Sequence, residues 1–158
     1  MQKSLLAISL QVLLDACRKD DTDVVFTLPQ VTQTGAQTFG FKLDGAIWIN
    51  YGQVCQPNGG SCRDNLTGEY FSGDGGITIK ADQVIYKDGV AQTQYVELEL
   101  LTGFGGEKTY STAAGDNITV LYLPVNDPFG YATADVDPNF TVTLNKLDTN
   151  TGIISGTF

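Results

Sequence analysis

Histidine is absent from this sequence and cations are scarce, because 9 Lys and Arg residues stand against 18 Asp and Glu residues, for a net charge of -9. The absence of histidine removes the commonest metal ligand and the usual general base near neutral pH. A negative chain without a Lys/Arg cluster repels nucleic-acid phosphates. The composition therefore argues against nucleic-acid binding and lowers the expectation of an enzyme.

The apolar run near the start, Ser4–Leu14, is eleven residues long, and apart from its small serines it has one polar interruption, Gln11. As a helix it would cover about 17 Å, roughly half of a bilayer core, which is too short to span a membrane. Lys3 gives the segment a positive start, so the run fits the apolar region of a signal peptide. The alternative, an N-terminal amphipathic helix in which Cys17 is a buried thiol, fits the length and flanks of the run less well.

At the end of the apolar run, Leu14, Ala16 and Cys17 stand where a bacterial lipobox has a branched apolar residue, a small residue and the lipidated cysteine. The segment therefore resembles a type II signal peptide, which implies cleavage before Cys17 and a lipid on that residue. Asp15 departs from the pattern, since this position is normally small and uncharged. The mature start, CRKDD, resembles the export signal of Bacteroidota lipoproteins, which implies display on the outer face of the outer membrane; a solvated linker is compatible with this interpretation.

From residue 38 onward the sequence alternates short β-prone runs with turn formers such as Asp44-Gly45 and Asp88-Gly89. This spacing predicts an all-β fold, a single antiparallel β-sandwich or β-barrel of about ten short strands, preceded by an N-terminal signal helix. The predicted strands are Thr38–Leu43, Ala46–Tyr51, Leu66–Ser72, Gly76–Ala81, Gln83–Lys87, Ala91–Thr102, Lys108–Thr112, Ile118–Val125, Tyr131–Ala134, Phe140–Leu147 and Ile153–Phe158.

The segment FGFKLDGAIW contains the sharpest local signal, because Asp44-Gly45 between two β-prone runs favours a two-residue type I′ hairpin loop. Such a loop places Phe41 opposite Trp48 on one face of the hairpin. The pairing predicts that Trp48 belongs to the core rather than to a sugar-stacking surface.

Cys55 and Cys62 flank the loop-forming sequence QPNGGS. In an exported protein they meet an oxidising environment, so a structural disulfide is predicted, with two free thiols as the alternative. Closing this eight-residue ring stabilises the fold by about 2.5 kcal/mol on the chain-entropy estimate. A zinc site lacks the other two ligands.

Other groups of residues in the sequence give little evidence of a functional site. The segment GFGGEKT, residues 103–109, lacks Walker spacing and a following helix, so a strand connection is the better interpretation. Asp127, Asp135 and Asp137 match no calcium loop and suit turns equally well. Because no catalytic motif is present, the sequence predicts no catalytic residue, no metal site and no cofactor.

The segment LPQVTQTGAQTFGFKLDGAIW, residues 28–48, closely resembles the start of a family of uncharacterised Bacteroidota lipoproteins, with the pattern LPxxTQxGxxTFGxxxxGxxW just after a lipobox. The family also has cysteines soon afterwards and a strand resembling IISGTF near its end. The resemblance implies a secreted, lipid-anchored β domain and brings no catalytic residues. It also implies one or two strands beyond Phe158, so a sheet edge open to pairing is expected here.

These observations divide the chain into a lipoprotein signal peptide at residues 1–16, a linker with the start of the family motif at residues 17–37, and a β domain at residues 38–158. We expect a bacterial outer-membrane protein anchored through a lipid on Cys17 and exposed at the cell surface. Its predicted function is that of a non-enzymatic binding or accessory module for an extracellular ligand or protein.

Two alternatives stay open. One is a hydrolase that acts on envelope or environmental polysaccharide with two carboxylates, a chemistry that needs no histidine. The other is a barrel that carries a small apolar ligand. The carrier requires an interior that Phe39, Phe41, Trp48 and their partners leave unfilled.

Overall fold

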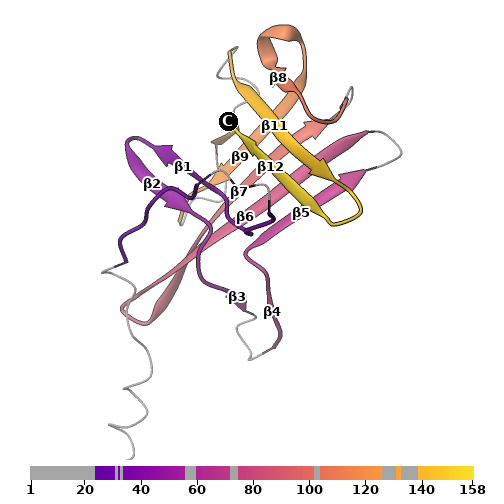
Figure 1. The fold of residues 1–158 in the computed structure, drawn as a ribbon. Helices are drawn as coiled ribbons and strands as arrows, with labels where there is room; N and C mark the ends of the chain where they lie inside the picture. Colours follow the sequence, from indigo (N-terminus) through magenta and orange to yellow (C-terminus); the bar gives the residue numbers. More distant parts are fainter. Residues whose placement is uncertain are drawn as a thin grey trace, which may run out of the picture.

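The structure, a computed structural model, describes residues 24–30, 32, 34–55, 60–71, 75–101, 104–125, 131–132 and 139–158 (Figure 1). Over these residues the fold is all-β, which confirms the predicted fold class. The predicted signal helix and Cys17 lie outside the described residues. Within the described ranges, no helix is long and apolar enough to cross a membrane.

The strands follow one another along the chain with short connections, and one 3-10 turn, η1, interrupts them. In chain order the elements are β1 Gly40–Leu43, β2 Ala46–Ile49, β3 Val54–Cys55, β4 Cys62–Arg63, β5 Leu66–Phe71, β6 Gly76–Lys87, β7 Val90–Leu101, β8 Thr109–Ser111, η1 Thr112–Ala114, β9 Asn117–Leu123, β10 Tyr131–Ala132, β11 Thr141–Asp148 and β12 Ile153–Thr157.

The largest sheet is antiparallel and has the strand order β10-β9-β7-β6-β5. A three-stranded sheet, β12-β11-β8, and the separate β1–β2 hairpin lie over one face of it (Figure 1). A small β3–β4 hairpin stands apart from both layers. The result is a two-layer arrangement in which the second layer consists of two separate pieces.

The core lies between these layers and follows from the period-2 alternation of β7. Val96, Leu98 and Leu100 point to the inner face, where they pair across β6 and β9 with other apolar residues. Val142 and Leu144 of β11 pack onto them from the three-stranded sheet. Each fully buried aliphatic side chain contributes about 1.5–3 kcal/mol to folding, so this interface stabilises the two-layer arrangement.

The β1–β2 hairpin has the predicted turn and register. Asp44 and Gly45 both have positive φ, 49° and 83°, as a type I′ turn requires. Phe41 pairs with Trp48, and their rings stack with centroids 5.1 Å apart. Trp48 is only 4% exposed and belongs to the core cluster, which confirms its predicted core role.

The segment after β2 continues the large sheet. The backbone N–H of Tyr51 donates to Asp82 O, and that of Val84 donates to Tyr51 O, so this segment pairs with the edge of β6 just beyond Leu66, the first residue of β5. The sequence predicted a break near Asp82 and two separate strands, but β6 is continuous. The reason is that Asp82 is buried and paired with Arg63, so a charged residue sits inside the strand without interrupting it.

Candidate functional site

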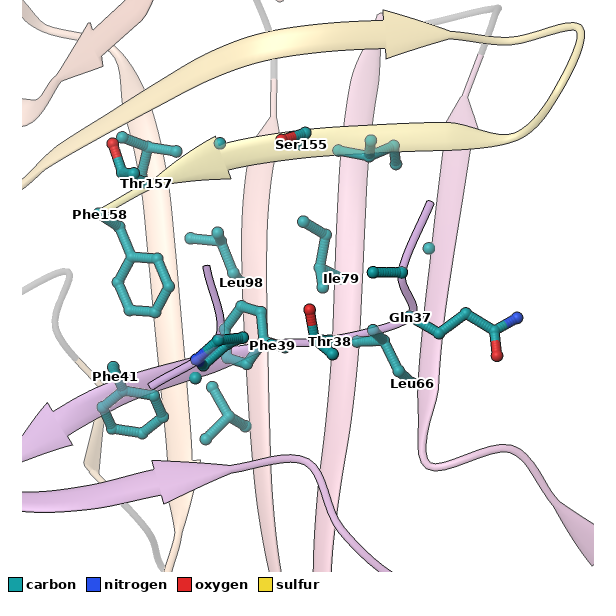
Figure 2. A pocket seen from close by; sticks show the side chains of 18 of the residues that line it. Gln37, Thr38, Phe39, Phe41, Leu66, Ile79, Leu98, Ser155, Thr157 and Phe158 are labelled. Atoms are coloured by element: carbon teal, nitrogen blue, oxygen red, sulfur yellow. The ribbon is translucent and has the colours of Figure 1, made fainter. Parts of the chain in front are cut away.

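The second layer leaves a gap between its two pieces, and an apolar cavity of about 1280 Å³ occupies it. Figure 2 shows β12 along one side of this gap and β1 along the other, with the inner faces of β6 and β7 behind them. Both bordering strands run in the same direction in this view. The cavity is therefore bounded by the two strands and floored by the large sheet.

Aliphatic side chains form the floor of the cavity. Leu66, Ile79 and Leu98 project into it from β5, β6 and β7, as Figure 2 shows. Val96 and Val120 extend the same surface. This face of the large sheet is apolar because the strand alternation turns its polar residues to the opposite side.

An aromatic cluster forms one end of the cavity. Phe158 stacks on Phe39 with ring centroids 5.1 Å apart and lies 5.8 Å from the ring of Phe41. Phe39 is buried, whereas Phe158 is 43% exposed. Phe41 stacks in turn on Trp48, so a change in the cavity has a direct path to the single tryptophan of the chain.

The chain segment before β1 crosses the gap, and we call its residues 28–30, 32 and 34–36 the strap. Its Pro29 lies against Gly40 of β1, and its Gly35 lies against Ile153 of β12. The Ser155 hydroxyl donates a hydrogen bond to the backbone oxygen of Thr32. Because these contacts reach both bordering strands, the strap covers the cavity on the side away from the large sheet.

Charge is nearly absent from the cavity wall. Among its lining residues only Lys42 and Asp44 are charged, and both are exposed at the β1 end. Burying an unpaired charge in such a place would be costly. The cavity is therefore suited to an uncharged apolar group rather than to an ion.

The predicted disulfide is present. Cys55 and Cys62 are joined with an S–S distance of 2.06 Å, and they link β3 to β4 outside the cavity wall. Cys17 lies outside the described residues, so lipid attachment stays a prediction. Asp127, Asp135 and Asp137 also lie outside them.

A polar cluster lies near β4, on the other face of the large sheet. Arg63 Nη1 lies 2.9 Å from Asp82 Oδ2, and the Asp82 side chain is only 3% exposed. Burial raises the pKa of Asp82, and the Arg63 charge lowers it in part. The Tyr95 hydroxyl donates to Glu97, and burial together with that carboxylate raises the Tyr95 pKa. The ion pair with Arg63 compensates the Asp82 charge, although Asp82 Oδ2 is buried and receives no hydrogen bond of good geometry from the described residues. The contacts of the cluster are made among its own residues, which fits a structural role.

The carboxylates do not form the pair that a glycosidase needs at the cavity, because Asp44 alone lines it among the described residues. Glu97 and Glu99 lie together, but they border a shallow depression of about 190 Å³ on the opposite sheet face. Lys80 Nζ lies 3.6 Å from Glu97 Oε1. Across the described part of the chain, His, Cys, Asp and Glu form no group of three that could hold a metal ion.

The glycine-rich loop between β7 and β8 closes on itself. Tyr110 accepts a hydrogen bond from Gly105 N and donates one to Gly106 O. The Lys108 ammonium lies 4.5 Å from the Tyr110 ring centroid and 3.7 Å from an Asp116 oxygen. The lysine therefore faces intramolecular partners, which agrees with a strand connection rather than a phosphate loop.

Sequence reasoning found Phe39, Phe41 and Trp48 but not the cavity beside them. No local sequence pattern indicates the cavity, because it depends on which strands the second layer contains and therefore on the tertiary structure. Comparisons of the chain with protein-family models, with curated proteins and with solved structures gave no match.

Proposed function

We propose that this protein is a non-enzymatic binding module whose ligand occupies the cavity between β1 and β12. The observation that carries the proposal is a volume of about 1280 Å³ with an aliphatic floor, an aromatic end and two charged residues at its rim. Known small-molecule sites enclose roughly 300–1,000 Å³ and are mostly apolar with few polar groups. The cavity is therefore large enough for a sizeable apolar ligand.

Hydrophobic burial supplies the driving force for binding here. Each 100 Å² of apolar surface that leaves water contributes about 2.5 kcal/mol before the costs of association. The aromatic cluster at Phe158 adds surfaces on which flat or branched apolar groups pack well. These features support the apolar-ligand alternative and favour it over the hydrolase alternative.

The proposed setting is the outer face of a bacterial outer membrane, with a lipid on Cys17 as the anchor. Along the chain, eleven residue steps lead from Cys17 to Leu28, the first residue of the strap. Fully extended, they reach at most about 36–40 Å. A lipid-anchored protein would thus hold the cavity close to the membrane, where apolar and amphipathic molecules are concentrated.

The test is a titration with N-phenyl-1-naphthylamine, a neutral apolar dye whose emission rises in apolar surroundings. Thr38 points into the cavity in Figure 2, so Thr38→Phe should fill part of it and weaken dye binding by at least about tenfold, or 1.4 kcal/mol. The matched control is Thr93→Phe, which places the same exposed substitution on the opposite sheet face. Equal binding by all three proteins would contradict the proposal.

A further inference from the structure

Two strand edges border the cavity without a neighbouring strand. Within the described residues, β1 pairs only with β2, and β12 pairs only with β11. An unpaired edge offers a row of backbone N–H and C=O groups that another strand can use. Small apolar molecules cannot satisfy such a row, whereas a polypeptide backbone matches its spacing.

The two edges also have a compatible direction. In Figure 2, β1 and β12 face each other across the cavity and run the same way. One strand running the opposite way would therefore be antiparallel to both, and simultaneous pairing requires that the two edges lie about two strand spacings, ~10 Å, apart when it binds. It would join the pieces of the second layer into one sheet with the order β2-β1-strand-β12-β11-β8.

The chemistry of the cavity specifies the side chains of that strand. Side chains on one face of it would point to the floor at Ile79 and Leu98, so these positions must be apolar. Side chains on the other face would point toward the strap, where Thr32, Thr34 and Gln30 line the cavity, so polar residues are tolerated there. The lengths of β1 and β12, 4 and 5 residues, set the length of the pairing segment.

We propose that the ligand is an extended segment of a partner polypeptide, with alternating apolar and polar residues, which adds as a strand between β1 and β12. The inference rests on the proposed function, because both place the ligand in the same cavity. Main-chain pairing supplies the affinity, and the apolar floor selects the sequence. A free apolar molecule and a second copy of this chain are the competing occupants.

The first experiment uses hydrogen–deuterium exchange with an acetylated and amidated peptide of sequence TVTLNKLD, which copies β11. This sequence has the required alternation, since Val142 and Leu144 are buried and Thr141 is exposed. The peptide should slow amide exchange in Gly40–Leu43 and Ile153–Thr157 by at least about tenfold, equivalent to about 1.4 kcal/mol of added local stability. The same peptide with proline at the positions of Thr143 and Lys146 should have no effect, because these residues direct their N–H groups to opposite edges of the strand and proline cannot donate a ladder hydrogen bond.

The second experiment tests strand addition without relying on how tightly a free peptide binds. The β11 sequence is joined behind Phe158 through Asp-Gly, the dipeptide that already forms both type I′ turns of this chain at residues 44–45 and 88–89. A short tether raises the effective concentration to the millimolar range. The tethered strand should protect both edges, and its proline variant should protect neither.

The outcomes separate the two proposals. Protection of both edges by the peptide or by the tethered strand supports strand addition. If N-phenyl-1-naphthylamine binds but neither strand protects β1 and β12, the cavity is a small-molecule site and the inference is overturned while the proposed function stands. The protein alone should not self-associate. If sedimentation velocity shows concentration-dependent self-association and the same edges are then protected, the occupant is a second copy of this chain and the inference is overturned. Failure of the dye and of both strands would overturn both proposals.

Discussion

The indole N–H of Trp48 donates a 2.7 Å hydrogen bond to the side-chain oxygen of Gln94, a residue 46 positions away in the chain. The same oxygen accepts a 3.0 Å hydrogen bond from the Tyr122 hydroxyl. One amide thus joins the β1–β2 hairpin to two strands of the large sheet. This contact fixes where β1 lies, and therefore fixes one border of the cavity.

Replacing Gln94 should loosen that border. Gln94→Ala removes the acceptor of the Trp48 indole N–H, and leaving this donor unsatisfied in the core costs about 1–3 kcal/mol. Urea denaturation followed by Trp48 emission should show a lower unfolding free energy and a red-shifted native spectrum. The control is Gln92→Ala, on the same face of β7 two residues away, which should change neither quantity by more than about 0.5 kcal/mol. Equal losses in the two variants would contradict the anchoring role.

Removing Arg63 should destabilise the protein more at neutral pH than in acid. Arg63→Met leaves the Asp82 carboxylate buried without its cation, and breaking a fully buried pair costs about 3–5 kcal/mol. Arg63 is 54% exposed, so solvent screens the pair and we expect a smaller loss, about 2 kcal/mol at pH 7. The free energy of unfolding, measured between pH 4 and pH 8, is the readout.

The sign of the pH dependence follows from Asp82. Its pKa is raised in the folded protein, so the folded state holds the proton more tightly than the unfolded state. The stability that this proton provides is complete below the unfolded value of 3.8 and is lost as pH rises through the raised folded value. Arg63→Met should raise the folded pKa of Asp82 further. The loss of unfolding free energy that this substitution causes should therefore become smaller as the pH falls. In an Asp82→Asn background, Arg63→Met should cost much less at every pH, and a loss that is the same at pH 4 and pH 8 would exclude this account.

The disulfide should stabilise the fold through the loop that it closes. Replacing both Cys55 and Cys62 by serine frees a ring of eight residues and should lower the unfolding free energy by about 2.5 kcal/mol. Because Arg63 follows Cys62 directly in β4, the loss should be smaller in the Asp82→Asn background, where the ion pair is already absent and cannot be weakened by a displaced β4. Thermal or urea denaturation of the four proteins measures this coupling, and strict additivity would argue against it.

Lipid attachment is tested in a Bacteroidota host. Cys17→Ala should move the protein out of the membrane fraction and abolish the mass of the diacylglyceryl group, because the lipid is the predicted anchor. The matched control is the double serine variant of Cys55 and Cys62, which should keep the lipid. Asp15→Ala should speed the conversion of precursor to mature protein, since it restores a small residue to the lipobox. A membrane fraction unchanged by Cys17→Ala would disprove the anchor.

The parts of the fold that sequence predicted well are those set by local chemistry. The Asp44-Gly45 turn determines the register of β1 and β2, and Asp88-Gly89 does the same for the long β6–β7 hairpin. The β3–β4 pair was not predicted, because a strand of two residues is too short to show an alternation of apolar and polar residues. The break predicted near Asp82 was wrong because a distant arginine compensates its charge.

The cavity could not be predicted from the sequence, for a different reason. Phe39, Phe41 and Trp48 were expected to be interior residues, and they are, but they fill only one end of the space between the layers. Whether the rest is filled depends on how far β1 lies from β12, two strands more than a hundred residues apart in the chain, since 153 − 43 = 110. No local pattern encodes that separation.

A ligand bound between β1 and β12 can be located by site mapping with a neutral apolar diazirine. After photolysis and proteolysis, mass spectrometry locates the labelled residues. We expect labels on the strap, on β1, and on residues near Ile79, Leu98 and Phe158, all suppressed by Thr38→Phe. Labels confined to the exposed apolar residues elsewhere, such as Val90 or Phe71, would contradict this placement of the ligand.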